Sequence, residues 1–353
     1  KIMEFIGVNE KTLKQYLPGA KLRNNKLIEK ILISGDFKAK EVSNEKFYGA
    51  HTPVYANQNT GRYYPHLTQI KALNSGQLGE GSIIAIIDTG VYYNHPHLSP
   101  NILVNPADGH GDDRDWLDND NNGFPDDYVG SDFYNGDAFP LDDNGHGTHV
   151  AGLAASTLMG VASKAKILPV KVLGSNGEGD LATIAAGIMY AIDKGANVIN
   201  LSLGGPGGNQ ITAEIQNVIN IIKMAKESNV VIVAAAGNGG DDGIGDCNDN
   251  SPIYPANIQE DNLISVASVD LYNGLASYSN FGGSTVHVAA PGGDIYTGGL
   301  NSTGLPYCNG PCASDQTPYY SSMGTSMATP IVSGLVAALI SKFPTASYKE
   351  IIK

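Results

Sequence analysis

The segment "SIIAIIDTG" at residues 82–90 indicates the fold class, because it stays apolar until it reaches Asp88 and turns at Gly90. It lacks the polar alternation of a strand with one wet face, so it predicts a strand buried on both faces. Five similar runs follow, most of them ending at glycine or a small polar residue: "KILPVKVLG" (166–174), "NVINLSLGG" (197–205), "VVIVAAAGN" (230–238), "NLISVASV" (262–269) and "VHVAAPG" (286–292). We therefore expect a mostly parallel central sheet.

Helical patterns separate these runs. "DLATIAAGIMYAIDKG" (180–195) begins at a capping Asp180 and stops at Gly195, and "TAEIQNVINIIKMAKESN" (212–229) follows the same logic. Strands that alternate with helices predict an α/β fold with helices flanking the sheet. The chemically active groups of such a fold are expected beyond the carboxyl ends of the strands.

Composition excludes several classes of protein. The 353 residues are 42% hydrophobic and 16% charged, which is typical of a globular protein with one large α/β domain and a smaller piece. No apolar run approaches the roughly 20 residues that span a bilayer, so we expect no membrane association. The net charge of −13 argues against a nucleic-acid partner.

The charge is unevenly distributed along the chain. Residues 1–50 hold 10 Lys+Arg against 6 Asp+Glu, whereas the remainder holds 12 against 29. This distribution fits a basic head that docks onto an acidic body, and it fits a solvated lysine-rich face equally well.

Four residues stand where polar groups would meet at one edge of the sheet. Asp88 ends the first buried strand, His146 lies between glycines in "NGHGTHVAG" (144–152), Asn238 follows the fourth strand, and Ser326 lies in "GTSMATP" (324–330). Singly, each has an ordinary explanation as a turn former, a structural histidine or a helix cap. Together they supply the nucleophile, the base, the group that orients the base and the oxyanion donor that acyl transfer needs.

Ser326 begins the apolar helical pattern "SMATPIVSGLVAALIS" (326–341). The start of that helix places backbone N–H groups and a positive dipole end near developing negative charge. We expect Pro330 to be tolerated because it lies in the first turn, where no backbone donor is needed.

These motifs, "DTG", "HGTHVAG", "AAGN" and "GTSMATP", in the order Asp, His, Ser, resemble the subtilisin-like serine proteases, or subtilases. The resemblance covers roughly residues 53–353. It implies a three-layer α/β fold and a secreted serine endopeptidase that acts on extended polypeptides. It also implies that Ser326 attacks the scissile carbonyl, His146 moves the proton, Asp88 holds the imidazole, and Asn238 with the Ser326 N–H holds the oxyanion.

Two other functions are weighed against this one. A catalytically inactive relative that serves as a binding protein on the same fold usually loses a triad member, and none is lost here. A zinc peptidase that uses "HGTH" (146–149) would need a third ligand, and the chain has no "HExxH" motif.

The resemblance also implies a substrate cleft. "NGEGD" (176–180) is similar to the edge strand that pairs with an extended peptide, and "SLGG" (202–205) is similar to the opposite wall. Leu181, Ile184 and Leu203 are candidates for an apolar pocket, with ordinary core packing as the alternative. Ile253 is expected at the base of the pocket for the residue before the cut. The predicted cleft residues are Glu178, Gly179, Leu181, Ser202, Leu203, Gly204, Ala236, Gly237 and Ile253.

An aspartate-rich stretch, "DNDNNGFPDD" (118–127), predicts a calcium site. Asp118, Asp120 and Asn122 fall at positions 1, 3 and 5 of a calcium-loop pattern, and Gly123 makes the turn. Phe124 offers its carbonyl, and Asp126 falls at position 9. Position 12 is Val129, so Asp127 or Asp132 would have to close the site. The alternative is an acidic loop without an ion.

The resemblance also bears on the ends of the chain. Subtilases are made with an inhibitory N-terminal prodomain, so residues 1–50 are interpreted as part of one or as a retained extension, and 53–353 as the catalytic domain. The last pattern, "SYKEIIK", stops at Lys353, so we expect a further segment beyond it. Cys308 and Cys312 predict a small disulfide, with pairing of Cys247 to either one left open. We expect a secreted, extracellular (or periplasmic or cell-surface) monomer.

Overall fold

A computed structural model describes residues 38–41, 65–72, 76–108, 117–208, 210–240, 242–270, 272–293, 302–303 and 321–353. Its central sheet has seven parallel strands, and all six strands expected from the sequence are among them. In spatial order they are β11 (Val288–Pro291), β10 (Leu263–Val269), β8 (Val231–Ala235), β6 (Val198–Leu201), β2 (Ile83–Asp88), β4 (Lys166–Lys171) and β3 (Ser131–Asp132).

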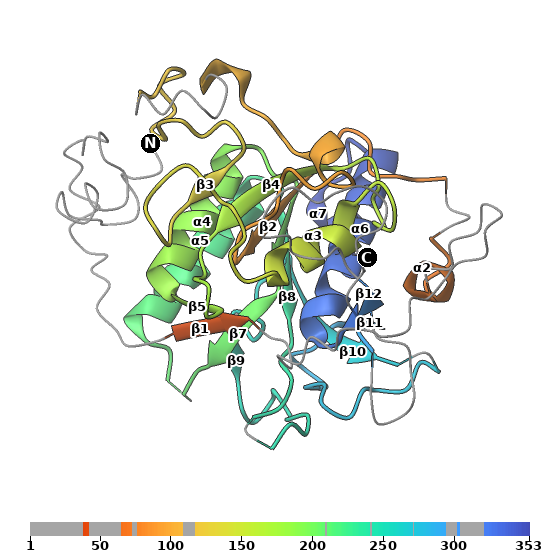
Figure 1. Cartoon of the computed structure of the whole chain (residues 1–353). Helices are drawn as coiled ribbons and strands as arrows, with labels where there is room; N and C mark the ends of the chain where they lie inside the picture. Colours follow the sequence, from red (N-terminus) through yellow and green to blue (C-terminus); the bar gives the residue numbers. More distant parts are fainter. Residues whose placement is uncertain are drawn as a thin grey trace.

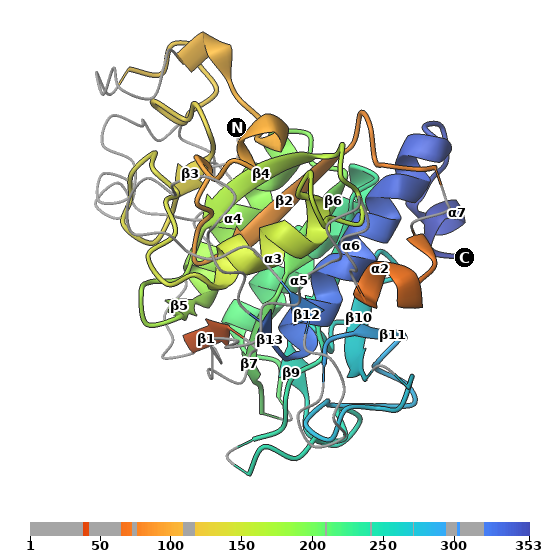
Figure 2. The same cartoon turned by 45° about the vertical axis from the view of Figure 1, so that its right-hand side comes forward.

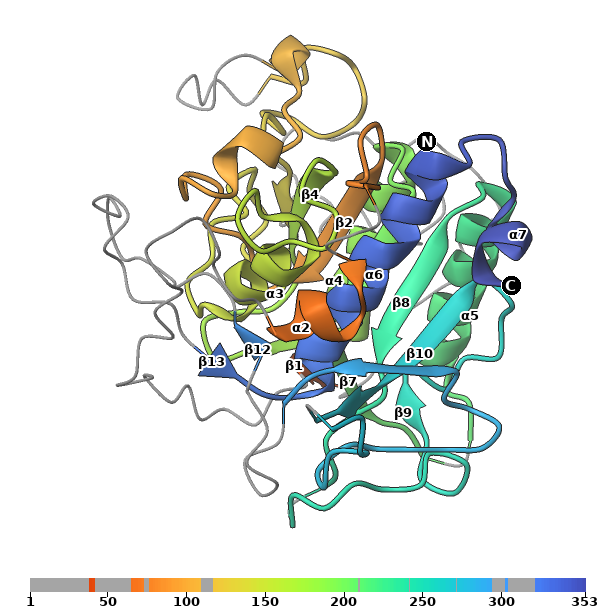
Figure 3. The same ribbon diagram turned by 90° about the vertical axis from the view of Figure 1, so that its right-hand side faces the viewer.

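Helices cover both faces of this sheet, which confirms the three-layer α/β prediction (Figure 1). Helices α4 (Leu181–Asp193) and α5 (Ala213–Glu227) lie on one face, and α3 (His146–Ala155) and α6 (Thr325–Lys342) lie on the other. Figure 3 shows α6 and α5 on opposite sides of strands β8 and β10.

Strand β2 shows why its sequence is apolar throughout. Ile84 and Ile86 belong to the core beneath α3 and α6, whereas Ala85 and Ile87 belong to the core beneath α4 and α5. All four side chains are fully buried. A strand sandwiched between two cores has no wet face, so its sequence does not alternate.

The helix boundaries follow the predicted caps. The Asp180 side chain accepts a hydrogen bond from the Thr183 N–H at the start of α4, and the Thr212 side chain accepts one from the Ile215 N–H at the start of α5. Gly195, just past α4, has φ +74°, a left-handed conformation that favours glycine.

The smaller elements lie around this frame. They are α2 (Pro65–Gln69), the 3-10 turns η4 (Ser99–Asn101) and η5 (Pro106–Asp108), the antiparallel pair β12 (Ser302–Thr303) and β13 (Ser321–Ser322), and α7 (Tyr348–Ile352). Among the described helices, α6 alone is long and apolar enough to cross a membrane, but 72% of it is buried inside the protein. That burial is typical of a core helix.

A second, smaller sheet was not expected from the sequence. Its strand order is β5 (Glu178–Asp180), β1 (Lys38–Glu41), β7 (Leu203–Pro206) and β9 (Ile253–Tyr254). Strand β1 runs antiparallel to both of its neighbours, so a piece of the N-terminal segment lies between β5 and β7 (Figures 1 and 2). The rest of residues 1–50 lies outside the described residues, and its interpretation as a prodomain or extension stays a prediction.

Candidate active site

Asp88 and His146 form a buried pair at the carboxyl edge of the sheet. Asp88 ends β2, and His146 is the first residue of α3. The His146 Nδ1 lies 2.7 Å from Asp88 Oδ1, and both side chains are fully buried. Asp88 Oδ1 also accepts the Thr89 N–H at 2.7 Å. Because Nδ1 faces a carboxylate, the neutral imidazole carries its proton there, and its Nε2 can then act as a base.

Asp142, which was not among the residues predicted from the sequence, organises the loop between these two residues. Its buried carboxylate accepts hydrogen bonds from the Gly145 N–H, the Thr148 N–H and the Thr89 hydroxyl, each at 2.9 Å. The Gly147 N–H in turn donates to the Thr89 hydroxyl at 2.9 Å. Asp142 therefore ties the residue that follows Asp88 to the turn that carries His146.

Lys171, at the end of β4, forms hydrogen bonds with the loops that carry Asp88 and His146. Its ammonium donates to the carbonyls of Thr89 at 2.7 Å and Leu173 at 2.6 Å, and to Asp143 Oδ1 at 2.7 Å. Only 1% of the side chain is exposed, whereas Asp143 is partly exposed. A buried ammonium needs such partners, since an unpaired charge is costly to bury.

Ser326 is the second residue of α6 and is fully buried. Its hydroxyl donates to the Ser202 carbonyl at 3.1 Å, and the Ser202 hydroxyl donates to the Ser326 carbonyl at 2.8 Å. This exchange joins the start of α6 to the residue that follows β6. It fixes the backbone of the candidate nucleophile against the sheet.

The expected place of Pro330 is wrong. Pro330 is the sixth residue of α6, inside the helix rather than in its first turn. A residue there would donate its N–H to the Ser326 carbonyl four positions earlier, and proline has no N–H. The Ser202 hydroxyl supplies the missing donor at 2.8 Å, which explains why the helix continues.

Asn238 presents a buried amide donor. Its Oδ1 accepts the Thr325 N–H at 2.8 Å and the Thr325 hydroxyl at 2.9 Å, so the amide plane is held by the start of α6. The Nδ2 is buried and has no hydrogen-bond acceptor among the described residues. An oxyanion donor has this character: it is held in place and left for a partner that arrives with the substrate.

The predicted cleft walls lie next to one another. Glu178 and Gly179 are in β5, Leu203 and Gly204 are in β7, and β1 pairs with both strands. Ile253, in β9, lies beside Gly237, since a Cβ added to Gly237 would be 3.4 Å from Ile253 Cγ1.

Three of the pocket candidates belong to the main core. Leu181, Ile184 and Leu203 are all at most 3% exposed and pack within the cluster beneath α4 and α5. Ala236 and Ser202 are fully buried near the ends of β8 and β6. The roles of the cleft residues in substrate binding stay predictions.

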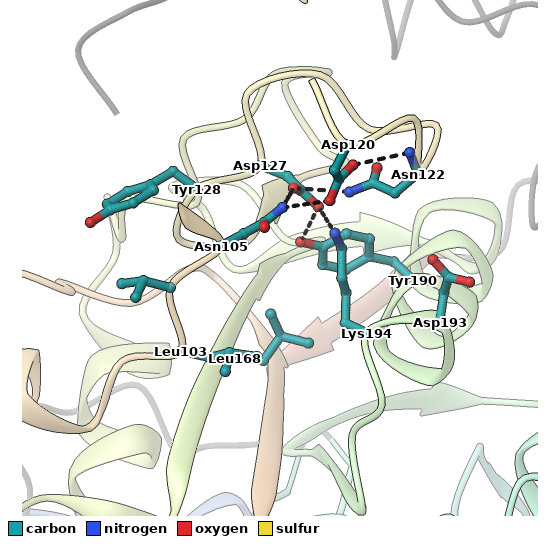
Figure 4. Close-up of a pocket in the computed structure, with 12 residues that line it drawn as sticks. Leu103, Asn105, Asp120, Asn122, Asp127, Tyr128, Leu168, Tyr190, Asp193 and Lys194 are labelled. Carbon is teal, nitrogen blue, oxygen red and sulfur yellow. Dashed lines mark hydrogen bonds and ion pairs between the residues drawn. The ribbon is translucent and has the colours of Figure 1, made fainter. Parts of the chain in front are cut away.

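The aspartate-rich loop folds into a cluster of carboxylates whose members differ from the predicted ligands. Figure 4 shows two of them, Asp120 and Asp127, with their neighbours Asn105 and Asn122. Carboxylate oxygens of Asp108, Asp120 and Asp127 lie within 4.8 Å of one another. Asn105 Nδ2 donates to Asp120 at 3.0 Å and to Asp127 at 2.7 Å, and Asn122 Nδ2 donates to Asp127 at 3.3 Å. Asp108 and Asn105 were missed because they lie before the loop in sequence.

The other predicted ligands have different surroundings. Both carboxylate oxygens of Asp118 accept backbone N–H groups of the turn at Asn122 and Gly123. The Phe124 ring is buried against Tyr190, with ring centroids 4.7 Å apart. Asp126 is buried, and its backbone adopts a left-handed conformation with φ +55°.

Asp132, the alternative closing ligand, accepts the Tyr134 and Asn135 N–H groups of its own turn, so Asp127 rather than Asp132 joins the cluster. Burial raises the pKa of Asp132 to about 6.

A lysine and a tyrosine contact one carboxylate of this cluster. Lys194 Nζ lies 2.5 Å from Asp127 Oδ2, and the Tyr190 hydroxyl donates to the same oxygen at 2.9 Å. Burial, and next a side-chain hydrogen bond with Asp108, raise the pKa of Asp127 to about 7. Burial alone would also raise the pKa of Asp120, but hydrogen bonds from Asn105 and Asn122 outweigh it and the pKa is lowered.

Cys247 carries a free thiol among the described residues, and its possible pairing with Cys308 or Cys312 stays a prediction. Cys308 and Cys312 lie outside the described residues, and their disulfide stays a prediction.

The chain is similar to several known proteins. The family model described as "Subtilase family" matches residues 79–352. Thermitase from Thermoactinomyces vulgaris is 38% identical over 306 residues, 85% of this chain and 88% of thermitase. Subtilisin DY from Bacillus licheniformis is 37% identical over 292 residues, 81% of this chain and 86% of its own. The crystal structure of a cold-adapted subtilisin-like serine proteinase superimposes with a TM-score of 0.60 at 27% identity, covering 79% of this chain and 82% of that one.

Proposed function

The chain belongs to the subtilase family of serine proteases, and we propose that it is an endopeptidase that cuts peptide bonds with Asp88, His146 and Ser326. One observation carries the proposal: a buried Asp88–His146 pair, with 2.7 Å between Oδ1 and Nδ1, shares an edge of the sheet with a serine in the first turn of α6. A triad is recognised by such geometry and roles.

The reaction follows from these groups. Ser326 Oγ leaves the Ser202 carbonyl, transfers its proton to His146 Nε2 and forms a bond to the substrate carbonyl carbon. Asn238 Nδ2 and the Ser326 N–H hold the oxyanion, while Asp88 stabilises the imidazolium. The C–N bond then breaks, and His146 gives the proton to the leaving amine. Water, activated by the same histidine, releases the acyl group and restores Ser326.

We propose that the substrate is an extended polypeptide that pairs with β5 and β7. Strand β1 supports this, because it is antiparallel to both walls: Ala39 lies opposite Gly179, and Lys40 lies opposite both Glu178 and Gly204. A peptide in this place gains main-chain hydrogen bonds on both edges whatever its sequence, which suits broad specificity.

The same pairing supports the proposal that the N-terminal segment inhibits the enzyme, with residues 53–353 as the catalytic domain. A substrate cannot use β5 and β7 while β1 occupies them. Lys40→Pro in the full chain removes one backbone donor from the middle of β1, so it should weaken β1 and speed labelling of Ser326 by a fluorophosphonate. An unchanged labelling rate would show that β1 does not limit access to the cleft.

We propose that Asp108, Asp120 and Asp127 hold a structural calcium ion. The donor set fits, because carboxylate oxygens are hard ligands that calcium prefers and three carboxylates gather here. When bound, the ion would supply positive charge to a loop that is otherwise crowded with negative groups. Calorimetric titration should show binding that is lost in Asp127→Ala and kept in Asp249→Asn, an exposed aspartate elsewhere. Equal binding by both variants would exclude this cluster.

Secretion and a monomeric state complete the proposal. A calcium loop with an incomplete ligand pattern is expected to bind weakly, and weak sites work at the millimolar calcium found outside cells. Fractionation of the native host, and gel filtration of the purified chain, check these two points.

Labelling with a fluorescent fluorophosphonate tests the catalytic proposal. The parent protein should be labelled, and Ser326→Ala should not be. Ser333→Ala is the matched control, because Ser333 is a buried serine further along the same helix. Labelling that survives in Ser326→Ala would refute Ser326 as the nucleophile.

A further inference from the structure

Asn280 is a fully buried residue with no role in the proposed chemistry, yet it contacts both neighbours of the oxyanion donor Asn238. The Asn280 N–H donates to the Gly237 carbonyl at 2.9 Å. The Asn280 Oδ1 accepts the Gly239 N–H at 2.6 Å. Asn238 is therefore held on both sides by one residue that lies far from it in sequence.

The segment needs an external clamp because of its own backbone. Gly237 has φ +112° and Gly239 has φ +73°, so Asn238 lies between two glycines in left-handed conformations. Glycine has the widest conformational freedom of any residue, and such a segment does not fix its own shape. A small rotation at either glycine would move the Asn238 amide away from the oxyanion.

The orientation of Asn280 is set by its partners. Its Oδ1 also accepts the Asp246 N–H at 2.9 Å, and both backbone partners are donors, so the oxygen must face them. Its Nδ2 donates to Asn248 Oδ1 at 2.9 Å, and Asn248 Nδ2 donates to the Ala236 carbonyl at 2.8 Å. The hydrogen bonds of Asn280 thus extend through Asn248 to Ala236, the residue after β8.

Space around the clamp is tight. A Cβ added to Gly237 would lie 2.6 Å from Asn280 Nδ2, so the two residues are in direct contact. The other end of Asn238 is held by Thr325, which leaves its Nδ2 as the buried donor without an acceptor among the described residues. Asn280 fixes the backbone, and Thr325 fixes the amide plane.

We propose that Asn280 is a positioning residue for the oxyanion hole, acting on catalysis through Asn238. This inference rests on the proposed function. Oxyanion donors lower the barrier only when they are preorganised, and loss of one donor costs about 10²–10³ in kcat. A donor that is present but no longer held should cost less, about 10-fold in kcat, with KM within about twofold.

A double-mutant cycle in the full chain tests the proposal, with kcat and KM measured on one peptide p-nitroanilide that the parent hydrolyses. Asn280→Ala should lower kcat about 10-fold in the parent. In the Asn238→Ala background it should lower kcat less than about twofold, because the amide donor that Asn280 positions is already absent. Equal fold losses in the two backgrounds would overturn the inference, as would an unchanged kcat in the parent.

Two further variants keep the test informative. Asn280→Asp retains oxygens for the Gly239 and Asp246 N–H groups, so it should keep more of the parent kcat than Asn280→Ala, and it serves in the cycle if the alanine variant does not fold. Asn262→Ala is the matched control, a buried asparagine bonded to the Ile222 and Val230 carbonyls at the far end of the sheet. It should lower stability and leave kcat unchanged.

The two hypotheses fail differently. The proposed function, and Asn280's role with it, fails if Ser326→Ala hydrolyses the peptide as fast as the parent. A loss in Asn280→Ala that persists in the Asn238→Ala background overturns only the role of Asn280.

Discussion

The hydroxyl of Ser202 donates the hydrogen bond to the Ser326 carbonyl that the backbone of Pro330 cannot donate. The energetic value of this hydrogen bond can be measured. Ser202→Ala leaves the Ser326 carbonyl without the donor at 2.8 Å, and it also removes the acceptor for Asn200 Nδ2 at 2.9 Å. Both groups lie in fully buried residues. Each buried polar group left unsatisfied costs about 1–3 kcal/mol.

Two such groups give an expected loss of about 2–6 kcal/mol in the free energy of unfolding for Ser202→Ala. Pro330→Ala restores a backbone N–H four residues after Ser326, where it can donate to the orphaned carbonyl. In the Ser202→Ala background it should recover about 1 kcal/mol, the net worth of one such hydrogen bond. In the parent, where the carbonyl is already satisfied, Pro330→Ala should be neutral or slightly destabilising because it gains chain entropy in the unfolded state.

The assay is urea unfolding followed by circular dichroism, with all variants made on Ser326→Ala so that no self-digestion occurs. The Ser326 backbone carbonyl is still present in that background. A Ser202→Ala loss below about 0.5 kcal/mol would show that the Ser202 hydroxyl does not replace the missing helix donor. So would a Pro330→Ala effect that is the same with and without the Ser202 hydroxyl, since the two groups would then not share a partner.

Three other perturbations follow from the site. Lys171→Met leaves the Thr89 and Leu173 carbonyls without a donor and should lower kcat/KM at least about 10-fold, whereas Lys164→Met, an exposed lysine, should leave it unchanged; steady-state kinetics decides. Burial lowers the pKa of His66 from 6.5 to about 4. The neutral side chain therefore stabilises the fold fully above pH 6.5. As the pH falls toward 4, the free energy of unfolding should drop by about 3 kcal/mol because of this residue. Urea unfolding against pH should show a shallower decline for His66→Gln, which can still donate to the Met159 carbonyl, and a parallel decline would contradict the assignment. Lys194→Met removes the cation nearest Asp127 and should tighten calcium binding about 10-fold by calorimetry, and weaker binding would mean that the lysine organises the site instead.

The residues proposed for chemistry were readable from the sequence because each lies in a local motif. Asp88 ends an apolar run, His146 and Ser326 stand among small residues at helix starts, and Asn238 follows a buried strand. Their neighbours in the chain carry enough of the pattern to place them at one edge of a parallel sheet. The structure confirms that placement for the strands and helices that hold them.

The residues that hold those groups in place were not readable. Asn280 and Asn238 are 42 positions apart, and Ser202 and Ser326 are 124 apart, so no local pattern connects either pair. Asp108 joins the acidic cluster from outside the predicted loop for the same reason. Asp142 had a local signal, an acid four residues before His146, but its hydrogen bonds appear only when the loop is folded.

The three layers of this protein can be predicted from local sequence, because burial on both faces makes each central strand a continuous apolar run and capping residues mark the helix ends. The side chains that complete the site become apparent only when distant segments of the chain are brought together. In the folded chain β1 lies between β5 and β7, Lys194 contacts Asp127, and the Ser202 hydroxyl, just after β6, donates to the Ser326 carbonyl in place of the N–H that Pro330 lacks. Hydrophobic periodicity is a property of neighbouring residues, whereas a hydrogen bond across the fold depends on where two distant segments come to rest.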